Sequence, residues 1–223
     1  MHPVVIVAII IAGVALAIVV FRADQKRKRL LRAWARSKGL RLKRIKKRGW
    51  EKEYPAFKLL TKGHHRHSSL HIEGEVDGKR VRCVDYRYTT GSGKNRQTHS
   101  YALVVMDTCC PVVPLHIRRE HLFDRVGEFF GHDDIDFESA EFSRKFHVAA
   151  SDRRWAYDVI HQKTMDYLLE TPSVTIEFGY AEIAVYRTGA LSAERCQEAL
   201  KVARRMFDLI PDDVLAQLKG DAS

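Results

Sequence analysis

The chain has 223 residues, and its 45 % hydrophobic and 30 % charged residues are ordinary for a globular protein, which excludes wholesale disorder. The formal net charge of +10 is concentrated in one segment. Residues 22–48 contain 14 Lys or Arg and one acidic residue, Asp24, whereas residues 49–223 contain 24 basic and 27 acidic residues. A basic nucleic-acid-binding domain is therefore not indicated.

The first predicted element is a transmembrane helix over residues 1–21. From Pro3 to Phe21 there is no charged side chain, and a helix of this length spans about 28 Å, close to the thickness of a bilayer core. A secretory signal would carry its positive charge before the apolar stretch, but here the charge follows it. A fully buried core helix is disfavoured because a small domain offers little room to cover all of its sides.

The order of apolar and basic residues also predicts an orientation. Lys and Arg near a span end are retained on the cytoplasmic side, and here they follow the span. We therefore expect a single-pass protein of the plasma (inner) membrane, with its N-terminus outside and its C-terminal domain in the cytoplasm.

Residues 22–48 are predicted to form a basic juxtamembrane helix and linker, with the helix ending at Gly39. Leu30, Leu31, Trp34 and Ala35 form an apolar seam among the cations. The expected partners are the lipid bilayer and its anionic headgroups, since juxtamembrane cations are attracted to acidic lipid. Docking of an acidic protein or nucleic acid is the alternative, and stacking aromatics for nucleic acid are sparse. The predicted membrane-surface residues are Lys26, Arg27, Lys28, Arg29, Arg32, Trp34, Arg36 and Lys38.

Residues 49–223 are predicted to form a cytoplasmic α+β domain with a mainly antiparallel sheet packed with helices. Strands are expected at 70–76, 79–88, 100–106, 114–117 and 144–150, with a hairpin turn at Asp77-Gly78, and a second hairpin is expected over 174–187. Helices are expected at 119–130, from a cap at Ser151 or Asp152 to Glu170, and from a cap at Ser192 to Ile210, with a short one after Pro211. Whether the domain divides near residue 131 is open.

Several motifs in this order, VDYRYTTGSG, PLHIRRE, DIDFESAEFSRKFHV and SDRRWAYDVI, resemble a broad group of uncharacterised bacterial proteins that are often membrane-anchored, a domain of unknown function. The resemblance covers most of residues 34–215. It implies a bacterial plasma membrane, assigns no activity and transfers no catalytic residue.

Candidate metal and thiol chemistry is weak in this sequence. The histidines of GHHRHSSLH are expected in a loop running into a strand, where His67 and His71 would lie roughly 13 Å apart, and no acid or Cys completes a ligand set. No C-x-x-C occurs, and the cytoplasmic thiols Cys109 and Cys110 are expected to be reduced, as small buried or half-buried residues at a strand end. We expect no metal and no cofactor.

Other candidate motifs also have simpler interpretations. Residues 132–141 are acidic but lack the Gly and Glu of a calcium loop. Gly91-Ser92-Gly93-Lys94 lacks the full spacing of a phosphate loop and is expected at a hairpin tip. Asp85 and Arg87 are expected to pair on one strand face, while Tyr86 and Tyr88 share the other face with Val84.

Two functions follow as hypotheses. The first is a non-enzymatic, membrane-tethered module that binds a protein partner or the lipid surface. The alternative is a membrane-anchored, hydrolase-like enzyme that uses Asp85, Asp136 or Cys110 together with a histidine.

Overall fold

A computed structural model describes the backbone of residues 3–120 and 135–221, and the side chains of residues 10–120 and 135–220. The helices are α1 (Pro3–Ser37), α2 (Trp50–Glu53), α3 (Lys58–Thr61), α4 (Ala140–Lys145), α5 (Arg153–Val159), α6 (Gln162–Glu170), α7 (Ala193–Asp208) and α8 (Asp212–Asp221), with a 3₁₀ turn η1 (Gly93–Asn95). The strands are β1 (Arg41–Lys43), β2 (His64–Val76), β3 (Lys79–Thr90), β4 (Gln97–Asp107), β5 (Leu115–Arg119), β6 (Phe146–Ala150), β7 (Thr175–Phe178) and β8 (Glu182–Thr188).

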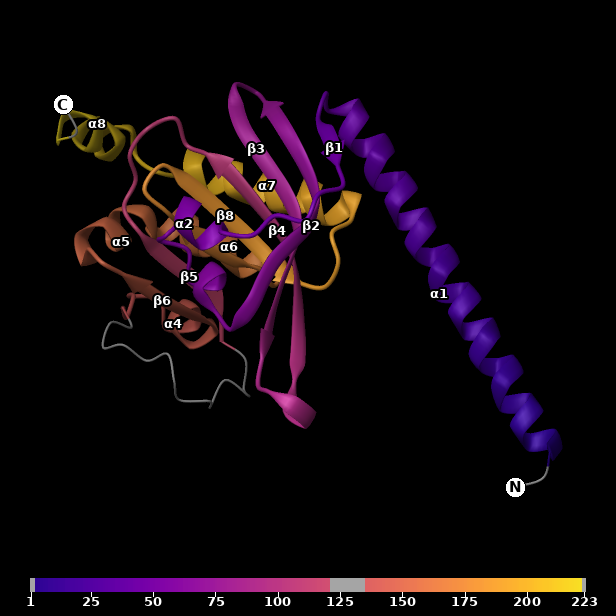
Figure 1. The fold of residues 1–223 in the computed structure, drawn as a ribbon. Coiled ribbons are helices and arrows are strands. Elements are labelled where there is room, and N and C mark those ends of the chain that lie inside the picture. Colours follow the sequence, from indigo (N-terminus) through magenta and orange to yellow (C-terminus); the bar gives the residue numbers. More distant parts are fainter. Residues whose placement is uncertain (1–2, 121–134, 222–223) are drawn as a thin grey trace.

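The eight strands form one antiparallel sheet in the order β1-β2-β3-β4-β8-β7-β5-β6. This confirms the α+β class and the antiparallel pairing. The two predicted hairpins are present, and Asp77 and Gly78 both have positive φ, as the tight turn between β2 and β3 requires. The long β3–β4 hairpin ends at η1, and all residues from Gly91 to Thr98 are exposed. Figure 1 shows this hairpin extending beyond the body of the sheet.

Both faces of the sheet are covered, because β3, β4 and β8 carry apolar side chains on alternate positions of both faces. On one face, Val81 and Cys83 pack with residues of α1, α4, α5, α6 and α7. On the other face, Val84, Tyr86 and Tyr88 pack with Trp50, Tyr54, Phe57, Leu59 and Leu60 from the α2–α3 segment. The predicted shared face of Val84, Tyr86 and Tyr88 is confirmed.

Helix α1 is continuous from the apolar stretch through the basic segment, and it ends before Gly39, whose φ of +68° is typical of a helix stop. Its C-terminal part packs on the domain, whereas its N-terminal part projects away from it (Figure 1).

The histidine cluster differs from the prediction. Residues from His64 onwards belong to β2, which accommodates them with register shifts against β3 and a positive φ at His65. His71 is fully buried: its Nε2 lies 2.8 Å from the Ser68 hydroxyl, and that hydroxyl also accepts a 2.7 Å hydrogen bond from Trp50. His71 is therefore part of the packing, and burial lowers the pKa of its imidazole.

Other differences are local. Arg119 is the last residue of β5 and Glu120 is not helical, so the helix expected over 119–130 does not begin where it was predicted; residues 121–130 lie outside the described residues. Asp152 caps α5 as predicted, through hydrogen bonds from the backbone N–H groups of Arg154 and Trp155. The helix expected to continue to Glu170 is interrupted at His161, whose ring lies 2.9 Å from the carbonyl oxygen of Leu209. Ser192 caps α7 as expected.

Candidate functional site

The C-terminal half of α1, residues 22–37, has two chemically different faces. Leu31, Trp34 and Ala35 are buried in the core beneath the sheet, with Leu31 0 % and Trp34 9 % exposed. Their positions, one and three residues apart, place them on one side of the helix. This face is the domain-facing side of α1, and apolar burial holds it there.

A polar contact extends this face toward the apolar end of α1. Nη1 of Arg27 lies 3.5 Å from Oδ2 of Asp85, which is on β3 and only 6 % exposed. Oδ1 of Asp85 accepts a 2.6 Å hydrogen bond from the backbone N–H of Leu191. The Arg27 guanidinium also donates to the Leu191 carbonyl and to the Asp24 carboxylate. One cation of α1 is thus bonded to a strand and to the segment before α7.

The neighbouring charges on α1 complete this contact. Lys28 pairs with Asp24, and the hydrogen bonds from Lys28 and then Arg27 hold the pKa of the Asp24 carboxyl below its ordinary value. Asp24 is the one acidic residue in the basic segment, and it faces the same side of the helix as Arg27. The negative charge of Asp24 therefore compensates the charges of Arg27 and Lys28, the cations nearest to the domain.

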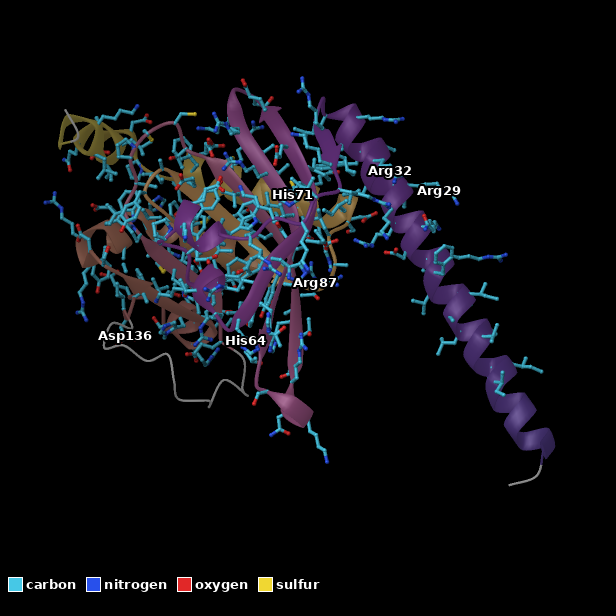
Figure 2. All side chains as sticks on the ribbon, viewed as in Figure 1. Arg29, Arg32, His64, His71, Arg87 and Asp136 are labelled. Carbon is cyan, nitrogen blue, oxygen red and sulfur yellow. The ribbon has the colours of Figure 1, made fainter. Side chains whose placement is uncertain are left out.

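The opposite face of α1 carries exposed cations. Arg22, Lys26, Arg29 and Arg36 recur at helical spacing on this face, and Arg32 is exposed beside it; Lys38, which follows the end of α1, is also exposed. None of the six makes an ion pair with any of the residues whose side chains are described. Figure 2 shows Arg29 directed away from the folded domain. We call Arg22, Lys26, Arg29 and Arg36 the outer cation face.

The apolar half of α1 is exposed in this structure. From Ile10 to Phe21 every described side chain is exposed, and the large hydrophobic residues are between 48 % and 65 % exposed. A contiguous exposed apolar surface of this kind marks an interaction site. Within the part of the chain whose side chains the structure describes, no helix is both long enough and apolar enough to cross a membrane. The side chains before Ile10, which include the first part of the apolar stretch, lie outside that part.

The eight predicted membrane-surface residues therefore divide into groups. Trp34 is a core residue, because its ring packs under the sheet instead of lying at the surface. Arg27 and Lys28 are half-buried and engaged in ion pairs. Lys26, Arg29, Arg32, Arg36 and Lys38 are exposed, as a surface-binding role requires.

The expected pairing of Asp85 with Arg87 is wrong. Asp85 is bonded to Arg27 and Leu191, whereas Arg87 is exposed. Sequence reasoning missed this contact, although an acid at a buried strand position is a signal that a cation must reach it.

The residues suggested for an enzyme do not converge. Asp85 lies against α1, Cys110 is buried near the end of β4, and Asp136 lies far from His71 and Arg87 in Figure 2. All four cysteines are free, and Cys109 is exposed, contrary to the expectation that the pair would be buried or half-buried. Within the described parts of the chain, no three His, Cys, Asp or Glu side chains are arranged to hold a metal ion.

A different polar cluster lies on the face of the sheet covered by α2 and α3. Glu177 of β7 is 1 % exposed, and its Oε1 accepts a 2.6 Å hydrogen bond from the hydroxyl of Tyr186 and a 3.4 Å bond from the N–H of Leu59. Nε2 of His116 lies 3.6 Å from the same oxygen. Oε2 of Glu177 and Nδ1 of His116 have no hydrogen-bond partner among the described residues. Both side chains line a hollow of about 250 Å³, together with Lys58, His147 and Ser151.

Burial controls the protonation of this cluster. It raises the pKa of the Glu177 carboxyl to about 7 and lowers the pKa of the His116 imidazole to about 3, the latter with help from Lys58 and Lys62. Near neutral pH, His116 is therefore neutral, and Glu177 is present in both its protonated and its ionised form. The sequence offered one signal for this cluster, since Glu177 and His116 are polar residues inside otherwise apolar strands.

Comparison with known proteins shows the fold only. No family model matches the chain, and no curated protein matches it. Its structure is similar to the crystal structure of the mycobacterial trehalose monomycolate transport factor A, TtfA, with a TM-score of 0.60 and 13 % sequence identity. The similarity covers 81 % of this chain and 92 % of that chain.

Proposed function

We propose that the chain is a single-pass protein of a bacterial plasma membrane, whose cytoplasmic α+β domain is fixed against the inner surface and takes part in lipid transport as a binding module. In this proposal residues 3–21 span the bilayer, the N-terminus lies outside, and the outer cation face meets anionic headgroups.

The observation that carries the proposal is the continuity of α1. One helix joins an exposed apolar half to a half that is packed and ion-paired with the domain. A domain joined to a span by a flexible linker would sample many orientations, whereas a docked helix sets one orientation relative to the membrane.

The link to lipid transport comes from the structural neighbour, whose title names it as a transport factor for trehalose monomycolate. A lipid-related role fits the exposed apolar helix and its cations, and it gives the resemblance to often membrane-anchored bacterial proteins a physical basis.

Membrane fractionation tests the tether. We expect the full chain to stay in the pellet after alkaline carbonate washing, because a spanning helix resists extraction. A variant with Ile11→Asp, Val14→Asp and Ile18→Asp should be released, since acidic residues at a span centre cost several kcal/mol. A matched variant with Lys52→Asp, Arg153→Asp and Lys163→Asp, all exposed on the domain, should remain in the pellet. Release of the unmodified chain by carbonate would refute the tether.

A second candidate function, a membrane-anchored hydrolase, is favoured by the hollow at Glu177 and His116. A buried carboxyl whose pKa lies near 7, beside a neutral imidazole, is suited to general acid or base catalysis. Hydrolysis of nitrophenyl esters and phosphates by the purified chain, lost in Glu177→Gln at unchanged thermal stability, would support it. Equal rates in both proteins would exclude this cluster as the catalytic group.

A further inference from the structure

The charges of β2, β3 and β4 are segregated along the strands. Near the β2–β3 turn, acidic and basic residues alternate, with Glu73, Glu75 and Asp77 among Lys79, Arg80 and Arg82. Toward the other end, no acidic residue occurs between Glu53 and Glu73 or between Asp85 and Asp107. This acid-free end of the strands carries His64, His65, Arg66, His67, Arg87, Lys94 and Arg96, which we call the basic end.

The basic end is accessible. Arg87, Lys94 and Arg96 are exposed, and none of them makes an ion pair with the described residues. The guanidinium of Arg66 donates hydrogen bonds to the carbonyl oxygens of Thr61 and Gly63, and it also pairs with the Glu51 carboxylate at 3.5 Å, so its charge is partly compensated within the domain. Arg87, Lys94 and Arg96 therefore carry positive charge that is not neutralised by any of the described residues.

Contacts between α1 and β3 show toward which end of the helix the basic end points. Trp34 of α1 and Val81 of β3 line the same apolar hollow, and farther along Arg27 contacts Asp85. The chain directions of β3 and α1 are therefore opposite. Moving along β3 toward the hairpin tip corresponds to moving along α1 from its C-terminal end toward its apolar half. Figure 1 shows the same relationship, because the β3–β4 tip and the N-terminal half of α1 both lie at the bottom of the view. In Figure 2, His64 and Arg87 also lie below His71.

Helix and strand rises indicate how far the tip reaches. From the contact between Arg27 and Asp85, α1 advances about 8 Å to Arg22, where the apolar half begins. Over the same number of residues, β3 advances about 17 Å to Thr90, and the tip lies beyond it. A bilayer that begins at Arg22 would therefore meet the tip.

From this geometry we infer that the basic end is a second membrane-contact surface, which binds anionic lipid headgroups and, with the outer cation face of α1, holds the domain at two points. The inference rests on the proposed membrane tether. Polybasic surfaces are attracted to anionic lipid over about one Debye length, so contact needs the close approach that the docked helix provides.

The test uses the full chain in nanodiscs of phosphatidylcholine and phosphatidylglycerol that contain a lipid with a nitroxide quencher on its headgroup. In a Cys109→Ser background, a fluorophore is attached at Asn95→Cys in the tip or, as the matched position, at Glu75→Cys near the β2–β3 turn. Both positions are exposed, and the three remaining cysteines are buried. We expect several-fold stronger quenching at position 95 than at position 75.

The charge dependence is tested in the same discs. Arg87→Gln, Lys94→Gln and Arg96→Gln together should reduce quenching at position 95 toward the value at position 75, as should discs of phosphatidylcholine alone. Replacing Arg80 and Lys201, exposed cations near the β2–β3 turn, with Gln should leave quenching unchanged. Equal quenching at both positions in a chain that has entered the disc overturns this inference alone. A chain that does not enter the disc overturns the proposed tether and this inference with it.

Discussion

The guanidinium of Arg27, in the basic segment of α1, lies 3.5 Å from the carboxylate of Asp85 on β3. This contact and the burial of Leu31, Trp34 and Ala35 make α1 part of the folded domain instead of a separate anchor. The orientation of the domain relative to α1 is therefore a property of the fold.

Replacing Asp85 with Ala should destabilise the protein by about 2–4 kcal/mol, because the buried N–H of Leu191 loses its acceptor and the half-buried Arg27 loses one of its two carboxylate partners. Arg27→Gln should cost less, and the double variant should show a coupling energy of about 1 kcal/mol or more in urea unfolding. Arg29→Gln, on the exposed face of the same helix, is the control and should stay within about 0.5 kcal/mol of the original chain. Additive effects at positions 27 and 85 would contradict a direct contact.

Docking of α1 by apolar burial predicts a contrast between adjacent leucines. Leu31 is 0 % exposed and Leu30 is 48 % exposed, so Leu31→Ala should lower the free energy of unfolding by about 2–5 kcal/mol, and Leu30→Ala by less than about 0.5 kcal/mol. Thermal unfolding of the two variants measures this difference. Similar losses in both would mean that α1 does not pack on the domain through Leu31.

The Glu177–His116 pair predicts opposite pH dependences of stability in its two single variants. Folding raises the pKa of Glu177 from 4.5 to about 7, so this group makes stability fall as pH rises through that range. Folding lowers the pKa of His116 from 6.5 to about 3, so this group makes stability rise with pH between those values. Between about pH 4.5 and 6.5 the two effects cancel in the original chain, because the folded and unfolded pairs each hold one proton in total.

Removing one of the two groups should therefore expose the pH dependence of stability that is due to the other. Glu177→Gln should become more stable as pH rises from 4.5 to 6.5, and His116→Gln should become less stable, each with a slope of up to about 1.4 kcal/mol per pH unit. Urea unfolding at a series of pH values measures both slopes. Slopes of the same sign in the two variants would show that burial does not shift these pKa values in opposite directions.

The outer cation face is expected to determine topology. Replacing Arg22, Lys26, Arg29 and Arg36 with Gln removes four cations next to the proposed span, each worth about 1 kcal/mol near an anionic surface, so a fraction of molecules should insert in the opposite orientation. The same number of substitutions at exposed domain cations, Lys52, Arg153, Arg154 and Lys163, should leave the orientation unchanged. Protease protection in membrane vesicles distinguishes the two populations. Identical protection patterns would assign topology to other residues.

Local patterns predicted much of this fold. Alternation located the strand at 70–76, an apolar run after a loop located the strand at 100–106, and the cap residues Asp152 and Ser192 start the helices that were expected after them. Contacts between distant segments were not predictable in this way. At the helix interruption the His161 ring lies 2.9 Å from the carbonyl oxygen of Leu209, and Arg27 contacts Asp85 and Leu191, so both places involve residues that are far apart in the sequence. A basic helix beside an apolar stretch has the same sequence pattern whether its cations meet lipid or a buried carboxylate.

The exposed thiol of Cys109 reports on whether α1 spans the membrane and holds the domain on the cytoplasmic side, as proposed. Intact cells that express the full chain are treated with a membrane-impermeant maleimide before or after permeabilisation, with Cys109→Ser as the unreactive control. We predict that Cys109 is labelled only after permeabilisation and that the labelled protein stays in the membrane after a carbonate wash. Labelling in intact cells, or labelled protein in the wash, would contradict the account.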